Sequence, residues 1–186
     1  MKNRVKKSLS LLLAVIMLLC AVPMSGSAAY ENTYTNTGNQ RSDIVGVAKT
    51  QVGNTNGLKY RSDGNSWCAA FVVWCARQAG IGSNTIKNTG WATADDLGVT
   101  YKGRNADRTT GINYTPQSGD LIIFDWKSNG YCYKSPASNY GDHVGIVDYV
   151  SNGYVYTIEG NSKNSSGVYA VRKKSYSLND SEIKGY

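Results

Sequence analysis

Residues 67–76 read WCAAFVVWCA, an uninterrupted run of apolar side chains. The run predicts a helix from Trp67 to Ala79, with Asn65 or Ser66 as its N-cap and Gly80 at its end. A helix that is apolar on all sides belongs in the interior of a domain. We therefore expect this helix to be buried at the centre of the fold.

The sequence around this run predicts one earlier helix and several later strands. The earlier helix has apolar positions between 44 and 52, a cap at Ser42 or Asp43, and Gly53 at its end. Apolar runs with strand character follow at 121–124, 144–150, 154–158 and 167–173. Helices followed by an antiparallel meander indicate the α+β class.

The first 29 residues have the order of a secretory signal peptide. Four basic residues at positions 2, 4, 6 and 7 precede an apolar run at 11–22, and small residues lead to Ala29. This run is shorter than the roughly 20 residues that span a bilayer. We expect a signal peptide at 1–29, a polar linker at 30–42, one domain at 43–186, and no stable membrane insertion after cleavage.

The charge of the chain does not favour a nucleic-acid partner. The formal net charge is +7, and the predicted signal peptide carries four of the positive charges. The remaining basic residues are scattered apart from the short run 172–174, and export removes the usual nucleic-acid targets. A mild positive charge suits the anionic wall surface outside a bacterium, although an ordinary soluble surface would explain it equally.

Three cysteines follow the predicted cleavage site, and an odd number leaves at least one thiol free or paired with another chain. Cys68 falls in the first turn of the apolar helix, where unpaired N–H groups and the helix dipole favour a thiolate. The same N–H groups could hold an oxyanion. Cys75 lies two turns deeper and suits core packing, an alternative that also applies to Cys68. The role of Cys132 stays open.

His143 is the only histidine in the chain, so a Cys–His enzyme would have to use it. It precedes a predicted strand, and the next strand ends in the polar residues Glu159 and Asn161. A three-residue hairpin loop at 151–153 would place these two side chains on the face of His143, whereas a two-residue turn would place them on the other face. A Cys–His–acid site therefore predicts the longer loop, pairing Val150 with Tyr154 and with Gly153 at positive φ.

Four sequence blocks resemble the CHAP family of papain-like cysteine amidohydrolases and peptidases. They are SWCAAFVVW (66–74), PQSGDLIIF (116–124), HVGIV (143–147) and IEGN (158–161). The blocks stand in the family's order, and the resemblance covers about 43–171. The related NlpC-like peptidases typically have Asp-Cys-Ser where this chain has WCA (67–69), which favours CHAP. The resemblance implies a papain-like (CHAP / NlpC-like) α+β fold, with N-terminal helices packed on an antiparallel sheet.

The resemblance also implies a function and a set of site residues. It implies a secreted, wall-associated cysteine peptidase or amidase acting on peptidoglycan, with 43–186 as the catalytic domain and no cofactor. We expect a monomer. The segment 61–65 holds one carboxylate, where some CHAP domains bind calcium through several aspartates, so we expect no required metal. The implied catalytic residues are Cys68 as nucleophile, His143 as general base and Glu159, which orients His143, with Asn161 alongside. The implied substrate-binding residues are Tyr60 and Trp67, and the Tyr60 hydroxyl would lie on the oxyanion side.

Other functions stay open at this point. The chain could be a catalytically silent cell-wall-binding module, a structural surface protein, or a cysteine amidase or transferase acting on a non-wall amide. A wall enzyme could be an N-acetylmuramoyl-L-alanine amidase or a peptidoglycan endopeptidase, and specificity would reside in the loops 81–117 and 127–142.

Overall fold

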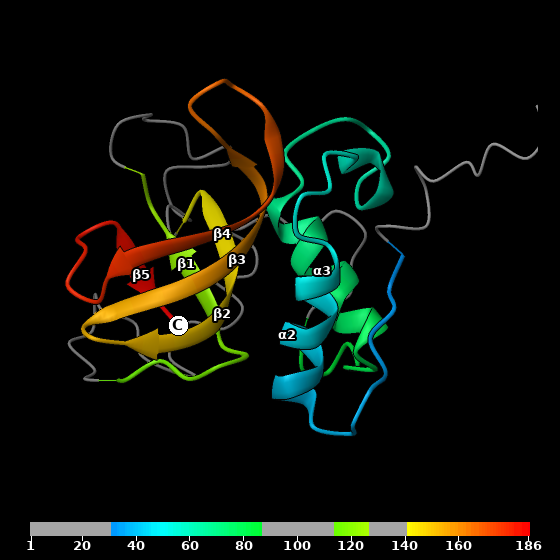
Figure 1. The fold of residues 1–186 in the computed structure, drawn as a ribbon, viewed down its shortest axis with the longest axis horizontal. Helices are drawn as coiled ribbons and strands as arrows, with labels where there is room; N and C mark the ends of the chain where they lie inside the picture. Colours follow the sequence, from blue (N-terminus) through cyan, green and yellow to red (C-terminus); the bar gives the residue numbers. More distant parts are fainter. Residues whose placement is uncertain (1–30, 87–113, 127–140) are drawn as a thin grey trace, which may run out of the picture. The chain divides into compact units, whose positions relative to one another are not determined.

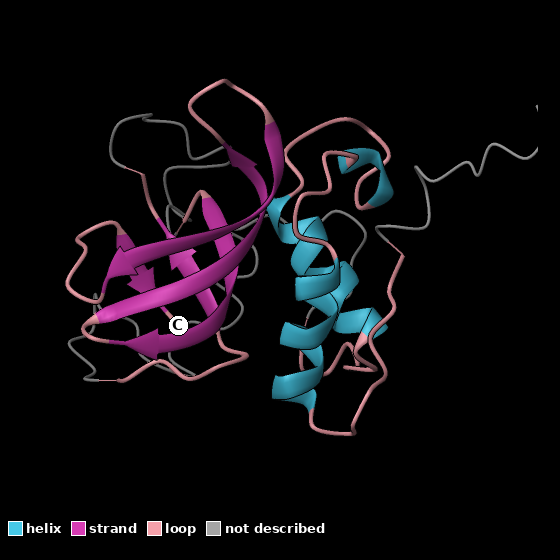
Figure 2. Cartoon of the chain, viewed as in Figure 1, coloured by secondary structure: helices cyan, strands magenta, loops and turns pink. Residues whose placement is uncertain are grey.

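The computed structural model describes residues 31–86, 114–126 and 141–186. Helix α2 spans Gln40–Thr50, the short 3-10 helix η2 spans Gly57–Lys59, and helix α3 spans Cys68–Gln78. The strands are β1 (Leu121–Phe124), β2 (His143–Ser151), β3 (Tyr154–Lys163), β4 (Tyr169–Ser177) and β5 (Ile183–Gly185). These helices precede the strands along the chain, as predicted (Figures 1 and 2). The predicted signal peptide lies outside the described residues.

The described strands form one antiparallel sheet in the order β4-β3-β2-β1-β5. Strand β2 lies at the centre, and Phe124 of β1 faces His143 across the ladder. Strand β5 was not predicted, because its three residues are too few to show a period-two pattern; it pairs with β1 at the sheet edge. This order puts the strands that carry His143 and Glu159 side by side in the middle of the sheet.

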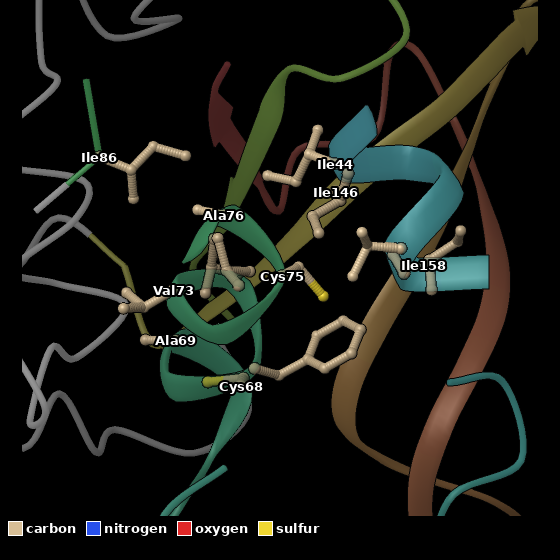
Figure 3. Close-up of a cluster of buried hydrophobic side chains, with 14 of the residues drawn as sticks. Ile44, Cys68, Ala69, Val73, Cys75, Ala76, Ile86, Ile146 and Ile158 are labelled. Carbon is tan, nitrogen blue, oxygen red and sulfur yellow. The ribbon is translucent and has the colours of Figure 1, made fainter. Parts of the chain in front are cut away.

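Helices α2 and α3 pack against one side of this sheet, where they share a core cluster with β2 and β3. All of α3 from Cys68 to Ala76 except Trp74 is buried, which confirms the predicted central helix. Figure 3 shows the Cys75 sulfur directed into this cluster. A smaller cluster around Phe124 and Val155 covers another part of the sheet. The sheet is therefore buried along the strands that carry the polar residues.

The predicted N-caps of both helices were wrong, for a shared physical reason. Helix α2 is capped by Asn39, while Asp43 instead accepts hydrogen bonds from the backbone N–H groups of Thr37 and Gly38. Helix α3 has Trp67 at its N-cap position and no side-chain cap. The side chain of Asn65 donates to Asp63 instead. In each case a nearby carboxylate draws the polar groups into a local loop.

The β2–β3 hairpin differs from the prediction in its turn and agrees with it beyond the turn. Asn152 and Gly153 form a two-residue turn, both with positive φ, and Val150 pairs with Val155 rather than Tyr154. The ladder then shifts by one residue, so that Val147 faces Thr157. This β-bulge around Asp148 supplies the extra residue that we assigned to the loop. Continuing the shifted register places Gly145 opposite Glu159, as predicted.

The bulge residue Asp148 is anchored to helix α2. Its side chain is 6% exposed, and its Oδ1 lies 2.7 Å from the Nζ of Lys49 in the last turn of the helix. A bulge shifts every following side chain of a strand relative to its neighbour. The Lys49–Asp148 ion pair thus holds α2 at the point where the register needed by His143 is set.

Candidate active site

Cys68 begins helix α3 and His143 begins strand β2, and the two side chains lie close enough for each to shift the ionisation of the other. The Nε2 atom of His143 lies 2.9 Å from Oε2 of Glu159 on the neighbouring strand. Because Nε2 faces the carboxylate, Nδ1 is the ring nitrogen left for the thiol. The three side chains thus form a continuous Cys–His–acid array at the junction of α3 and the sheet.

Glu159 is held by three donors inside the protein. Its side chain is 2% exposed. Besides its contact with His143, it accepts hydrogen bonds from Oγ1 of Thr157 at 2.6 Å and from the hydroxyl of Tyr176 at 3.2 Å. Burial alone would raise the pKa of this carboxyl, but His143 and the two hydroxyl donors lower it below its usual value. Glu159 is therefore a fixed anion facing the imidazole.

The protonation of Cys68 and His143 follows from this arrangement. Burial disfavours the charged form of each group, but the attraction between the two groups outweighs burial, and Glu159 adds to the effect on the imidazole. The pKa of the Cys68 thiol is lowered, and the pKa of His143 is raised to about 10. The pair thus favours thiolate and imidazolium.

Cys75 shows the opposite behaviour on the same helix. It is fully buried in the apolar cluster, and burial raises the pKa of its thiol well above the usual value. Its expected role in core packing is confirmed by this position. The difference between the two cysteines arises from their neighbours, because only Cys68 has a cationic partner in contact.

Gly145 provides the space that Glu159 occupies. A Cβ atom at this position would lie 2.8 Å from Cγ of Glu159, a separation too short for two carbon atoms in contact. The glycine in the block HVGIV (143–147) therefore permits the carboxylate to cross the neighbouring strand and reach His143. This is the packing that the register argument predicted.

Three aromatic rings surround the imidazole and its carboxylate. The rings of Phe124 and Trp126 stack at 4.6 Å, and their centroids lie 5.9 and 6.0 Å from that of His143. Tyr176 packs on Phe124 at 4.6 Å while its hydroxyl reaches Glu159. These rings keep water from the buried side of the His–Glu pair, which strengthens the interaction between the two charges.

The remaining predicted site residues lie apart from this hydrogen-bonded array. Asn161 is half-buried with φ of 57°, and its side chain makes no hydrogen bond to another described residue. The Tyr60 hydroxyl bonds Gln51 and Asn54 at 2.9 and 2.8 Å. Trp67 is 7% exposed and stacks on the Tyr60 ring at 5.2 Å. Roles for these three in catalysis or substrate binding stay predictions.

Sequence reasoning missed Thr157 and Tyr176, the two hydroxyl donors to Glu159. Thr157 could have been found, because it precedes Glu159 by two residues on one strand and so shares its face. Tyr176 required the pairing of β3 with β4, which places Val155 opposite it. The turn residues at 164–167 do not fix this register by themselves, because the ladder shifts between Glu159 and Ser162.

Some expectations concern residues outside the described ranges. Cys132 and most of the two loops assigned to specificity lie outside the described residues. Within 31–86, 114–126 and 141–186, no group of three or more His, Cys, Asp or Glu side chains could hold a metal ion. Asp63, the one carboxylate of the segment 61–65, forms an ion pair with Arg61.

Comparison with known proteins agrees with this geometry. A family model described as the CHAP domain matches residues 60–161, more than half of the chain. The chain belongs to the CHAP family. This assigns the helices and antiparallel sheet of the domain to the expected papain-like α+β fold. The matched CHAP segment contains Cys68, His143 and Glu159, and ends at Asn161.

Two solved structures are similar to this CHAP protein. One is described as the crystal structure of Ly7917, with 19% identity and a TM-score of 0.46. The other is described as Ly7917 with the hydrolyzing product of MDP, with 18% identity and a TM-score of 0.44. They cover 78% and 80% of this chain, which spans 61% of each of theirs. No curated protein sequence matches the chain significantly.

Proposed function

We propose that this CHAP protein is a secreted peptidoglycan hydrolase that cuts a peptide or amide bond through a thioester on Cys68. The observation that carries the proposal is the contact of a helix-start thiol with the chain's only histidine, itself held by a buried carboxylate. CHAP membership supports peptidoglycan as the substrate class. Membership alone leaves both an amidase and an endopeptidase compatible with the site.

In the first half of the proposed reaction, the Cys68 thiolate attacks the carbonyl carbon of the scissile bond. The C=O electron pair moves to oxygen, and N–H groups of the first turn of α3 are available to an oxyanion because no side chain caps this helix. The His143 imidazolium then gives its proton to the leaving nitrogen, and the C–N bond breaks. The product is an amine and a thioester on the sulfur.

In the second half, neutral His143 takes a proton from water, and the oxygen attacks the thioester. Collapse of this intermediate breaks the C–S bond, releases a carboxylic acid and restores the thiolate–imidazolium pair. Glu159 holds the ring through Nε2 in both halves, so Nδ1 stays directed at the reacting atoms. The carboxylate stabilises the charged ring and takes no proton itself.

The location and boundaries of the enzyme complete the proposal. We assign 1–29 to a signal peptide, 30–42 to a linker and 43–186 to a catalytic domain that acts at the cell wall as a monomer. Among the described residues, no helix is long and apolar enough to cross a membrane. Detection of the mature N-terminus after residue 29 in culture medium would support this assignment, and an intact intracellular chain would oppose it.

Digestion of purified peptidoglycan tests the function. Wild type, Cys68→Ala and Cys75→Ala are compared by mass analysis of the released fragments. We expect wild type and Cys75→Ala to release the same fragments and Cys68→Ala to release none. Release of free stem peptides would identify an amidase, and cleaved stems or crossbridges would identify an endopeptidase. Equal release by Cys68→Ala, or no release by wild type, would contradict the proposal.

A further inference from the structure

The loop that leads into helix α3, residues 61–66, is built around one internal ion pair. The Arg61 guanidinium donates from Nε and Nη2 to the two carboxylate oxygens of Asp63 at 2.7 and 3.0 Å. Asp63 also accepts from the backbone and side chain of Asn65. The side chain of Arg61 is 14% exposed and that of Asp63 is 29% exposed. A two-pronged pair of this kind holds its geometry better than a pair joined by one hydrogen bond.

This ion pair is connected directly to the start of the nucleophile helix. Nη1 of Arg61 donates to the carbonyl oxygen of Ser66 at 3.1 Å. Ser66 stands two residues before Cys68, and no side chain caps the helix between them. The Arg61 charge also interacts electrostatically with Cys68. The same guanidinium therefore orders the loop and lies within the field of the thiol.

Two further charged groups near the thiol belong to the sheet. His143 of β2 contacts Cys68, and Glu159 of β3 stands behind the imidazole. Arg61 interacts electrostatically with the thiol from the loop that precedes α3, and Asp63 is paired with Arg61. Arg61 is thus a second cation near the sulfur that the catalytic mechanism does not require for proton transfer, and Asp63 is its counter-charge.

We propose that Arg61 is a positioning residue for the nucleophile, which fixes the loop into α3 and stabilises the Cys68 thiolate by its charge, and that Asp63 limits this stabilisation. The inference rests on the proposed function for its catalytic meaning. The ionisation of the thiol can, however, be measured without any substrate. A positive charge near a thiolate lowers the thiol pKa, and a negative charge near it raises the thiol pKa.

The two members of the pair should therefore act in opposite directions. Arg61→Gln removes the cation, and we expect the midpoint of thiolate formation to rise by about 1 pH unit, the low end for one neighbouring charge. Asp63→Asn leaves the cation uncompensated, so the midpoint should fall. Arg61→Lys keeps a charge without the two-pronged geometry, and its midpoint should lie closer to wild type than that of Arg61→Gln.

The rate of alkylation by iodoacetamide, measured against pH on the full chain, gives these midpoints. Peptide mass analysis restricts the readout to Cys68, and thermal unfolding reports whether each variant is folded. A purely structural role would shift Arg61→Gln and Asp63→Asn in the same direction, because both break one ion pair. Shifts in the same direction, or unchanged midpoints, would overturn the proposal.

The alkylation midpoints test the role of Arg61 independently of the proposed peptidoglycan hydrolase activity. If Arg61→Gln does not fold, Asp63→Asn and Arg61→Lys still decide the question: the midpoint should fall below wild type in Asp63→Asn and lie above wild type in Arg61→Lys, because the lysine charge is placed less well. Wild type that fails to release peptidoglycan fragments while the midpoints separate would reject the substrate and keep the Arg61 role. If wild type releases fragments but the variants all share the wild-type midpoint, the proposed function is kept and the Arg61 role is rejected.

Discussion

Replacing Glu159 with Gln should lower the pKa of His143 by a large and measurable amount. The imidazole and carboxylate are separated by 2.9 Å and almost fully buried. At an effective dielectric of about 20, unit charges at this distance interact by about 6 kcal/mol, or about 4 pH units as an upper limit. Neighbouring opposite charges usually shift a pKa by about 1–3 units. We therefore expect the pKa to move from about 10 in wild type to about 7–9.

The measurement is favoured by the composition of the chain, which contains one histidine. In protein without a polyhistidine tag, the imidazole Cε1–H resonance reports His143 alone and can be followed by NMR against pH. The exposed substitution Glu31→Gln serves as the control and should leave the titration unchanged. A Glu159→Gln titration that coincides with wild type would refute the argument that the buried carboxylate sustains the imidazolium.

Three further predictions follow from the same contacts. Folding lowers the pKa of Glu159, so ionised Glu159 stabilises the protein above the unfolded pKa of 4.5, and this contribution is lost as pH falls below 4.5 through the folded pKa. Urea unfolding should therefore show the free energies of unfolding of wild type and Glu159→Gln converging in acid. A difference between them that does not change with pH would contradict this. Gly145→Ala forces a Cβ atom against Glu159. It should lower the free energy of unfolding by about 1–3 kcal/mol and the rate of peptidoglycan release by at least about tenfold. Gly82→Ala adds its Cβ atom in open space and should change neither quantity. Deleting Asp148 should abolish activity by reversing the faces of the strand before it, and inserting one residue into the β2–β3 turn should restore part of it; no rescue, with a folded double variant, would argue against the register mechanism.

Most of the fold followed from apolar periodicity alone. The central helix was predictable because its buried run is long and ends in glycine, and the four longer strands because each carries a continuous apolar segment. The bulge was not predictable, since either a longer turn or an extra strand residue satisfies the same count between His143 and Glu159. The structure uses the extra strand residue, and the partner that holds it, Lys49, belongs to a helix distant in sequence.

The residues of the candidate site also differ in how far local sequence predicts them. Cys68 and His143 were predictable because a helix start favours a thiolate and the chain has no other histidine. The donors to Glu159 depend on strand pairing, and the Arg61 contacts depend on a loop conformation that competes with helix capping. Sequence therefore named the residues that follow from local rules or from one hairpin register, and it missed those that depend on more distant contacts.

The hydroxyl of Tyr176 reaches the site from strand β4, fifteen positions beyond the end of the family match at residue 161. The matched segment also begins after Lys49, whose ion pair anchors the bulge. A fragment trimmed to residues 60–161 for expression or fusion would retain the reacting groups and lose both supports. A start near residue 32, where the compact unit begins, and retention of strand β4 would keep both supports in a transplanted module.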